Sequence, residues 1–562
     1  MFNQKTAYLI GLLSLVGHGL WAVQNAQFFP FQDLRPGMRG IGYTVFSSLK
    51  GIETFDVEIL GRMENYVGPA QDLIIARVVG GPFEKSSVVA GMSGSPVYVD
   101  GKLIGALSYA FGNFTKDAIA GITPIANMVN KTGGMQPIDT GNQMRPIALP
   151  LVASGLSPLV AKSYASELSR RGFGKPIAGA GGFGSSSQNT EKLVAGGPFA
   201  AILVSGDMNL SALGTVTWTN GNEFVALGHP FLQNGVSELP VAGAYVVTTV
   251  FGQQEPYKMG QPTGIVGVLE SDRSSGVHGF TGLKPRMMPL EVKINGKTWK
   301  YQIARTVRDT PFLASLAISN SLAMAMEHEL GGTYELDVSA RLSSGDDVRY
   351  RRMLSASGQP IEVGAVATFL EPLFMLQDQD FKKIEFNAIT ANIKHTDDVK
   401  NIRLIGLSLG EEPQGGQDLE VVLYAQPWKQ SAKKYRGVMK WPALNWTGNY
   451  QVLALDRLGA MALEREVGIS AEVTSYADIL DQIRTMPTDT QVCLYAKQQT
   501  SVNHVLGYNL TDLPISFKET LTDMAAGTEV LFNSRAVRLG CMDLGAVVTG
   551  KVLKSYGEKR QS

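Results

Sequence analysis

Ser93 stands between two glycines in a stretch that combines a hydroxyl group with a tight turn, GMSGSPVYVDGKLIGALSY at 91–109. A serine attacks a carbonyl carbon when a base lies within hydrogen-bond reach and backbone N–H groups face the developing oxyanion. Flanking glycines let the backbone turn sharply and present its amides. We therefore expect Ser93 to be a nucleophile and the amides of Gly91, Met92 and Ser93 to form an oxyanion hole. The alternative is a glycine-rich turn in which Ser93 only bonds the local backbone.

The residues after this serine predict a β-hairpin that anchors the turn. Asp100-Gly101 is its expected hinge, and Pro96 fixes Ser95 at the entrance of the first strand, so Ser95 is expected to be structural. No helix is expected directly after the serine. A lipase or esterase nucleophile elbow, which requires one, is therefore the weaker interpretation.

A histidine base has to come from elsewhere in the chain, and His229 is the best candidate. It ends an apolar strand, EFVALGHPF, that follows the Asn220-Gly221 hairpin turn. A buried structural histidine bonded to a carbonyl beside Pro230 is the competing interpretation. His278 is a weaker candidate for the base. The remaining histidines beyond the N-terminal segment are expected to be structural or solvated: His328, His395 and His504.

Two stretches together resemble the signatures of a known family, the SpoIVB serine peptidases of bacterial sporulation signalling. They are GMSGSPVYVDGKLIGAL around Ser93 and LGTVTWTNGNEFVALGHPF, which ends just after His229. The resemblance covers roughly residues 36–300. It implies a chymotrypsin-like double β-barrel with Ser93 as nucleophile and His229 as base. Here Ser93 precedes His229 by 136 positions, the reverse of the family's order, so the two halves are permuted, and a PDZ-like segment is missing.

The acidic member of a catalytic triad is an open question in this sequence. In the family it lies shortly before the serine, where this chain has Gly81, with Glu84 near but out of alignment. An acid holds the imidazole tautomer and stabilises its charged form. Asp272, in the same β-rich block as His229, is the preferred candidate. Asp207 and Asp72 are weaker ones. The alternative for Asp272 is that it caps a turn or pairs with Arg273, and the alternative for Asp207 and Asp72 is that they bond turn amides. A Ser-His dyad and an inactive site also remain as alternatives.

Composition excludes several function classes for this chain of 562 residues. Lys+Arg and Asp+Glu number 50 each, so net charge gives no reason to expect nucleic acid as a partner. No Cys/His spacing is typical of a zinc site, and neither a metal nor an organic cofactor is implied. Cys493 and Cys541 are the two cysteines. They form either one disulfide or two buried thiols in neighbouring strands.

Residues 1–26 have the form of a signal peptide, with Lys5 before an apolar run from Ala7 to Ala22. A retained N-terminal anchor is the alternative, and a membrane contact is expected only in that case. The expected location is extracytoplasmic: periplasmic, secreted or on the cell surface.

The expected fold class is mainly β, and the order of short Val/Ile/Thr-rich runs and Gly/Pro breaks suggests five parts. A permuted chymotrypsin-like double barrel is followed by a helical segment and a C-terminal β-sandwich-like region. The parts are a first barrel half with the serine motif at 36–128, a helical and Gly/Ser-rich linker at 129–197, a second barrel half with the histidine motif at 198–308, a helical or mixed connecting segment at 309–380, and a β-rich interaction domain at 381–562.

Two functions from different classes fit this sequence. The first is a secreted serine endopeptidase that hydrolyses an extended peptide or a protein of the bacterial envelope. The second is an inactive peptidase-fold protein that binds or scaffolds an envelope protein through its C-terminal domain. The distance between the Ser93 hydroxyl and the His229 imidazole separates them. Three tryptophans of the C-terminal domain are expected to pack in a core rather than contact a ligand: Trp428, Trp441 and Trp446.

Overall fold

The computed structural model describes residues 28–556, apart from 85, 112–116, 131–143, 175, 179–191, 253–255, 326–330, 357–365, 412–414, 444–449, 468–472, 506–507 and 511–529. The described chain is mainly β, with several sheets, some of them curled. It divides into two compact units. The first holds the described residues up to Glu291 together with Trp299–Met324 and Phe386–Ala388, and the second holds the rest.

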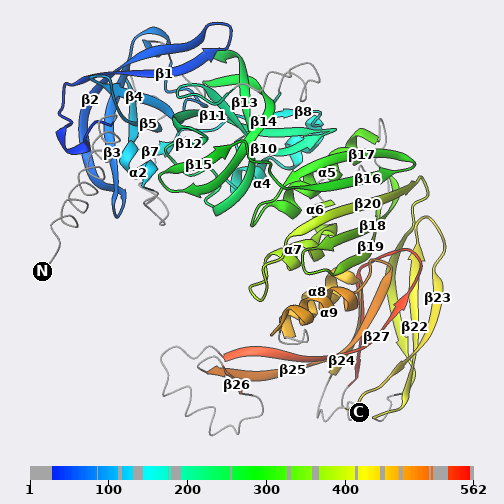
Figure 1. Ribbon diagram of the computed structural model, residues 1–562. Helices are drawn as coiled ribbons and strands as arrows, with labels where there is room; N and C mark the ends of the chain where they lie inside the picture. Colours follow the sequence, from blue (N-terminus) through cyan, green and yellow to red (C-terminus); the bar gives the residue numbers. More distant parts are fainter. Residues whose placement is uncertain are drawn as a thin grey trace, which may run out of the picture. The chain divides into compact units, whose positions relative to one another are not determined.

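The first sheet of unit 1 closes on itself (Figure 1). Six strands pair in the order β4-β1-β2-β3-β6-β5, and β4 pairs with β5 to complete the ring, while β7 adds to the free edge of β5. We call these six strands the serine ring. Its strands and β7 are β1 (Arg39–Ser47), β2 (Gly51–Gly68), β3 (Gln71–Val79), β4 (Ser95–Val99), β5 (Lys102–Phe111), β6 (Ala118–Pro124) and β7 (Met144–Pro146).

A second ring of six strands follows in unit 1, in the order β10-β13-β14-β15-β12-β11, closed by the pairing of β10 with β11. We call it the histidine ring. Its strands are β10 (Pro198–Gly206), β11 (Asn209–Asn220), β12 (Glu223–Ala226), β13 (Gly235–Val250), β14 (Tyr257–Arg273) and β15 (Gly276–Thr281), and its neighbours in the sheet include β8 (Leu151–Ser154), β9 (Pro176–Ala178), β16 (Met287–Ile294) and β17 (Lys297–Ala304).

The sequence accounts for both rings through tight turns and apolar strands. Asp100-Gly101 and Asn220-Gly221 each join paired strands, and Asp100, Gly101 and Gly221 have positive φ, which Gly, Asn and Asp tolerate best. Strand β11 is buried along nearly its whole length, which fits a continuous apolar run rather than an alternating one. Each ring encloses its own hydrophobic core.

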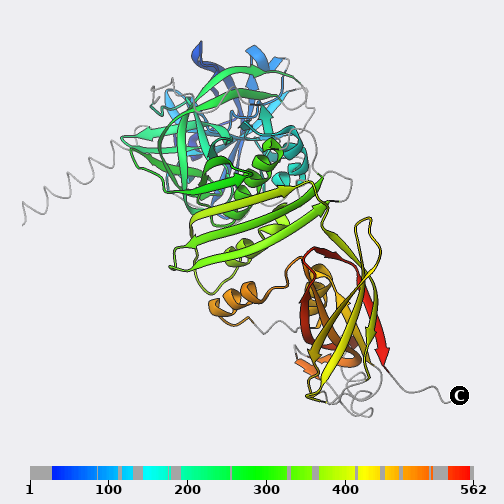
Figure 2. The same ribbon diagram turned by 90° about the vertical axis from the view of Figure 1, so that its right-hand side faces the viewer.

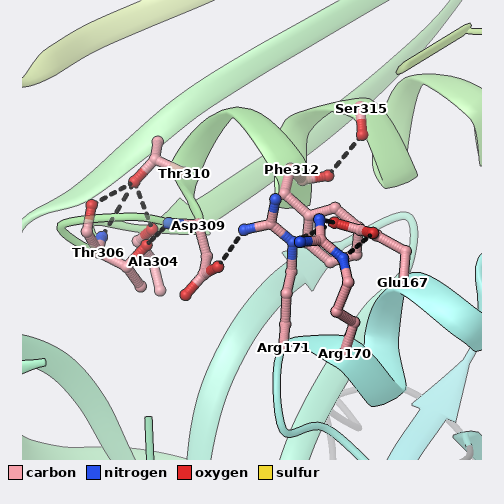
Figure 3. A network of polar contacts seen from close by, with 9 residues as sticks. All are labelled: Glu167, Arg170, Arg171, Ala304, Thr306, Asp309, Thr310, Phe312 and Ser315. Carbon is pink, nitrogen blue, oxygen red and sulfur yellow. Dashed lines mark hydrogen bonds and ion pairs between the residues drawn. The ribbon is translucent and has the colours of Figure 1, made fainter. Parts of the chain in front are cut away.

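The described part of unit 1 also contains helices. They are α3 (Pro158–Ser163), α4 (Ala165–Arg170) and α5 (Thr310–Ala325), while the short α2 (Ile125–Val129) follows β6. Arg171, just after α4, lies between Glu167 and Asp309 at 2.7 and 2.6 Å, with its guanidinium over the ring of Phe312 (Figure 3). These contacts fasten α4 to the start of α5. Helix α5 begins at Thr310 and is buried on all sides over most of its length.

Unit 2 contains two sheets that enclose one core. The first pairs in the order β23-β22-β21-β28, and the second in the order β26-β25-β24-β29 with β27 on β25. Figure 2 shows the yellow strands of the first sheet in front of the orange and red strands of the second. Hydrophobic residues of both sheets share the cluster between them, as in a β-sandwich. The strands of these two sheets are β21 (Asn401–Leu409), β22 (Asp418–Pro427), β23 (Lys433–Lys440), β24 (Tyr450–Leu455), β25 (Gln491–Val505), β26 (Tyr508–Leu510), β27 (Val530–Asp543), β28 (Val547–Thr549) and β29 (Lys551–Tyr556). Strand β20 (Phe386–Thr396) lies outside them and pairs with β18 (Gly332–Leu342).

The described part of unit 2 also contains a hairpin and four helices. They are β18 (Gly332–Leu342), β19 (Asp347–Ala356), α6 (Val366–Phe369), α7 (Glu371–Gln377), α8 (Arg457–Val467) and α9 (Tyr476–Thr485). A disulfide joins Cys493 on β25 to Cys541 on β27, which decides between the two expectations for the cysteines. Trp441 is buried in the sandwich core as expected, and Trp446 lies outside the described residues. The expectation was wrong for Trp428, which is exposed at the surface with Lys429 over its ring.

Residues 1–26 lie outside the described residues, and so do residues 179–191, which make up most of the Gly/Ser-rich run. Within the part of the chain that the structure describes, no helix has the length and apolar character needed to cross a membrane. The expected connecting segment at 309–380 is divided between the units, because its residues up to Met324 belong to unit 1 and the residues from Ala325 to Glu385 belong to unit 2.

Candidate active site

Ser93 and His229 meet where the two rings contact each other. Ser93 Oγ lies 2.5 Å from His229 Nε2, although the two residues are 136 positions apart in the chain. Both side chains are buried, with 0% of Ser93 and 3% of His229 exposed. The contact brings the two sequence motifs together with the atoms that a nucleophile and its base require.

Glycines shape the serine turn because side chains do not fit there. Gly91 and Gly94 have φ of +91° and +96°. A Cβ on Gly94 would lie 1.8 Å from the carbonyl oxygen of Thr215, which no structure tolerates. The GMSG sequence therefore lets the serine turn approach β11 of the histidine ring at backbone contact distance.

Strand β11 binds the serine turn through its threonines. The Thr215 amide donates to the Ser93 carbonyl at 2.9 Å, and the Thr215 hydroxyl donates to the Gly91 carbonyl at 2.8 Å. The Thr217 hydroxyl donates to the Gly94 carbonyl at 2.8 Å. Three carbonyls of the serine turn thereby accept a hydrogen bond from β11, so the peptide groups of the turn are held in one orientation.

The turn before His229 carries backbone strain. Leu227 has φ of +70°, and the Gly228 amide donates to the Ala226 carbonyl at 2.9 Å, which defines a γ-turn of the rare positive-φ kind. A bulky residue in this conformation costs energy that the surrounding packing must offset. The turn places the Leu227 carbonyl 2.9 Å from Ser93 Oγ, where it competes with His229 Nε2 for the single hydroxyl proton.

A hydroxyl pair of the serine ring holds the same turn from the other side. The Thr123 hydroxyl donates to the Gly228 carbonyl at 2.6 Å and lies 2.7 Å from Ser108 Oγ. Thr123 and Ser108 come from the paired strands β6 and β5. The position of His229 is therefore set by both rings.

The imidazole of His229 faces three oxygens. Nδ1 lies 2.7 Å from the Pro230 carbonyl, so Nδ1 carries the proton and Nε2 is left to accept from Ser93. The Ile147 carbonyl also lies 3.1 Å from Nε2. Burial is the main cause that lowers the pKa of His229 to about 4, and the bonds to the Pro230 and Ile147 carbonyls oppose it. The imidazole is thus neutral at pH 7, as a base must be.

Asp272 does not contact the imidazole of His229. Its carboxylate accepts from the amides of Phe231, Leu232 and Asn234 at 2.7, 2.6 and 3.4 Å. Asp272 is buried, and burial raises the pKa of its carboxyl. The preferred acid of the sequence analysis therefore caps the loop that follows His229, while a main-chain carbonyl, that of Pro230, takes the place beside Nδ1.

The three amides expected in the oxyanion hole have different partners. The Met92 amide donates to the Val89 carbonyl at 3.1 Å within the turn, so it faces away from any substrate. The Gly91 amide donates to the Ala148 carbonyl at 2.9 Å, and the Ser93 amide makes no hydrogen bond to a described residue. The amides of Gly91 and Ser93 are therefore the pair that the geometry offers, and Met92 is not a donor.

A buried lysine that the sequence analysis did not single out lies beneath the serine turn. Lys258 on β14 donates to the hydroxyls of Thr44 and Thr215 at 2.7 and 3.1 Å, and it pairs with no carboxylate among the described residues. Burial lowers the pKa of Lys258 to about 7. Because Thr215 bonds Gly91, Lys258 supports the turn through one intermediate side chain.

The remaining candidates have structural partners. His278 lies 2.5 Å from Glu223 on the neighbouring strand, and His395 binds the Gly331 carbonyl at 2.8 Å. Asp207 and Asp72 accept from the amides of Lys300 and Asn65, respectively.

The Ser95 hydroxyl donates to the Met92 carbonyl, in keeping with its expected structural role. His328 and the side chain of His504 lie outside the described residues.

Comparison with known proteins adds no identification. No protein-family model, curated protein or solved structure matches the chain. In the described part of the chain, no group of three or more His, Cys, Asp or Glu side chains is arranged to hold a metal ion. The chemistry of the site therefore has to be inferred from its own residues.

Proposed function

We propose that this chain is an extracytoplasmic serine endopeptidase of the SpoIVB-like type, with a permuted chymotrypsin-like double barrel. The single observation that carries the proposal is the 2.5 Å contact between Ser93 Oγ and His229 Nε2. The two rings of six strands support the double-barrel assignment. Each ring carries one of the two sequence motifs, and the motifs meet where the rings contact each other. The sequence resemblance supplies the family.

The reaction follows from the positions of the two side chains. Ser93 Oγ bonds to the carbonyl carbon of a peptide while its proton passes to His229 Nε2. The amides of Gly91 and Ser93 stabilise the oxyanion of the tetrahedral intermediate. The imidazolium then gives its proton to the leaving amine as the C–N bond breaks, and water hydrolyses the acyl-enzyme by the same transfers.

The site works as a dyad in which a carbonyl replaces the acid. The Pro230 carbonyl holds the tautomer as a carboxylate would, but it carries only a partial negative charge, so it stabilises the imidazolium less. A slow peptidase is the expected result. The disulfide between Cys493 and Cys541 supports a location outside the cytoplasm, where such bonds persist.

A non-catalytic envelope scaffold is the second candidate function. The observation in its favour is that no carboxylate of a described residue contacts His229, and that both Ser93 and His229 are closed to solvent. In either case we propose that the sandwich of unit 2 binds a protein partner of the envelope.

A fluorophosphonate probe, which reacts with activated serines, tests the proposal. Labelling of the folded protein that disappears in Ser93→Ala and falls sharply in His229→Ala supports a peptidase. A folded protein that stays unlabelled at high probe concentration over long incubation favours the scaffold.

A further inference from the structure

A segment of the chain's own backbone lies in the candidate active site. Strand β7 pairs antiparallel with the edge of β5, and the pairing continues one residue further, where the Ile147 amide donates to the Ser108 carbonyl at 2.9 Å. An extended peptide that adds to a sheet edge in this way is a common mode of peptide recognition. Ser108 lies on the edge of β5 that also pairs with β4, the strand that follows the serine turn.

The next two carbonyls occupy the groups that catalysis would use. The Ile147 carbonyl lies 3.1 Å from His229 Nε2. The Ala148 carbonyl accepts from the Gly91 amide at 2.9 Å, which is one of the two oxyanion donors. Base and oxyanion donor are thus filled by successive peptide groups of one segment.

Side chains anchor the segment on both sides of these carbonyls. Ile147 is 3% exposed and packs in the core cluster of the serine ring, with Met92 of the serine turn among the cluster's members. The Pro150 carbonyl accepts from the Leu213 amide of the histidine ring at 3.0 Å. The segment is therefore bound as a ligand would be, with an apolar side chain in a pocket and backbone bonds at each end.

We propose that residues 144–150, MRPIALP, are a tethered peptide that fills the peptide-binding cleft and keeps other peptides out until it leaves. The inference rests on the proposed function only in that it treats the space beside Ser93 and His229 as a peptide-binding cleft. The segment is an inhibitor rather than a substrate because no single one of its carbonyls is placed at both the base and the oxyanion donor. The Ile147 carbonyl faces the base, and the carbonyl bound to the oxyanion donor belongs to the following residue.

A binding experiment without catalysis tests the proposal. The probe is a fluorescent synthetic peptide of sequence MRPIALP, and its anisotropy is measured with full-length Ser93→Ala and with Ser93→Ala/Ile147→Ala. Loss of the isoleucine anchor weakens the tethered copy but leaves the pocket for the added one. Since apparent affinity scales with the open fraction, the double variant should bind at least about tenfold more tightly.

A matched variant controls for general loosening of the core. Ser93→Ala/Ile104→Ala creates a cavity in the same cluster, on β5 but outside the segment. It should bind the peptide no better than Ser93→Ala. Equal affinity in all three proteins, or no binding in any, overturns the proposal. The same peptide with alanine in place of isoleucine should bind weakly to the double variant.

Amide hydrogen exchange of the wild-type protein provides a second measurement in case Ile147→Ala does not fold. If the segment leaves as a unit, the amides of Ile147 and Gly91 exchange together and faster than those of the ring strands. Exchange of both only on global unfolding contradicts the proposal. Neither experiment requires Ser93 to react, so a failed labelling test bears on the peptidase proposal alone.

Discussion

His229 and Pro230 are neighbours in the chain and also hydrogen-bond partners, since Nδ1 of the imidazole lies 2.7 Å from the Pro230 carbonyl. The carbonyl that orients the base is therefore set by the turn that carries it, with Leu227 and Gly228 both at positive φ. Such a carbonyl fixes the tautomer without an ionisable partner. The pKa of the base then depends on its burial more than on a neighbouring charge.

Asp272→Asn distinguishes a loop cap from a triad acid. The variant loses amide bonds to the loop after His229, so we expect the free energy of unfolding to fall by about 1–3 kcal/mol. The rate of fluorophosphonate labelling, per folded molecule, should fall less than about tenfold. A loss near 10⁴-fold, the scale of a triad acid, would contradict this assignment.

The pH dependence of labelling reports the protonation of His229. Burial lowers its pKa to about 4, so the base stays neutral, and the labelling rate stays level, from pH 8 down to about pH 5. Half of the rate should remain near pH 4. The unfolded chain binds a proton on this imidazole below pH 6.5, so stability also falls between pH 6.5 and 4. A midpoint near 6.5 for the labelling rate would refute the account.

Lys258 should impose a slope on stability at alkaline pH. Its pKa is about 7 in the folded protein against 10.5 in an unfolded chain, so only the unfolded state is protonated between these values. The free energy of unfolding therefore rises with pH from 7 to 10.5, by up to about 1.4 kcal/mol per unit, and this contribution is flat below 7. Urea unfolding from pH 6 to 9.5 should show this slope in the wild type and lose it in Lys258→Met. Equal slopes would count against a neutral buried lysine.

Gly94→Ala and Gly101→Ala form a matched pair for the contact between the rings. Both glycines have positive φ, but a Cβ at Gly94 meets the Thr215 carbonyl, whereas a Cβ at Gly101 meets nothing within 4 Å. We expect Gly101→Ala to cost about 1 kcal/mol from backbone strain alone. Gly94→Ala should cost at least about 4 kcal/mol and abolish labelling. Chemical denaturation of both variants measures the difference, and similar losses would refute a ring contact at Gly94.

The sequence was sufficient to predict the two chemical groups but not everything around them. The glycines beside Ser93 and the strand end at His229 mark their positions locally, so the pair could be named before their contact was known. The threonines at 215 and 217 alternate on an apolar strand, a signal that could have revealed the clamp on the serine turn. The role of Asp272 depends on which amides the loop after His229 presents, and no local pattern encodes that.

Long-range geometry accounts for what sequence reasoning missed. Nothing in MRPIALP distinguishes it from a linker, because its position in the cleft depends on the edge of β5 and on the Gly91 amide. Likewise, each ring needs pairings between strands that are far apart in the chain, such as β1 with β4 and β10 with β13. Lys258 looks like a surface lysine until β14 is seen to pass beneath the serine turn.

Mass-spectrometric mapping of the fluorophosphonate adduct tests most directly whether Ser93 is the nucleophile. We predict one adduct, on Ser93, which Ser95→Ala should retain because the Ser95 hydroxyl bonds the Met92 carbonyl. Faster labelling at the same site in Ile147→Ala would follow from the opened cleft. An adduct on another serine, or one that persists at full rate in His229→Ala, would contradict the pairing of Ser93 with His229 as nucleophile and base.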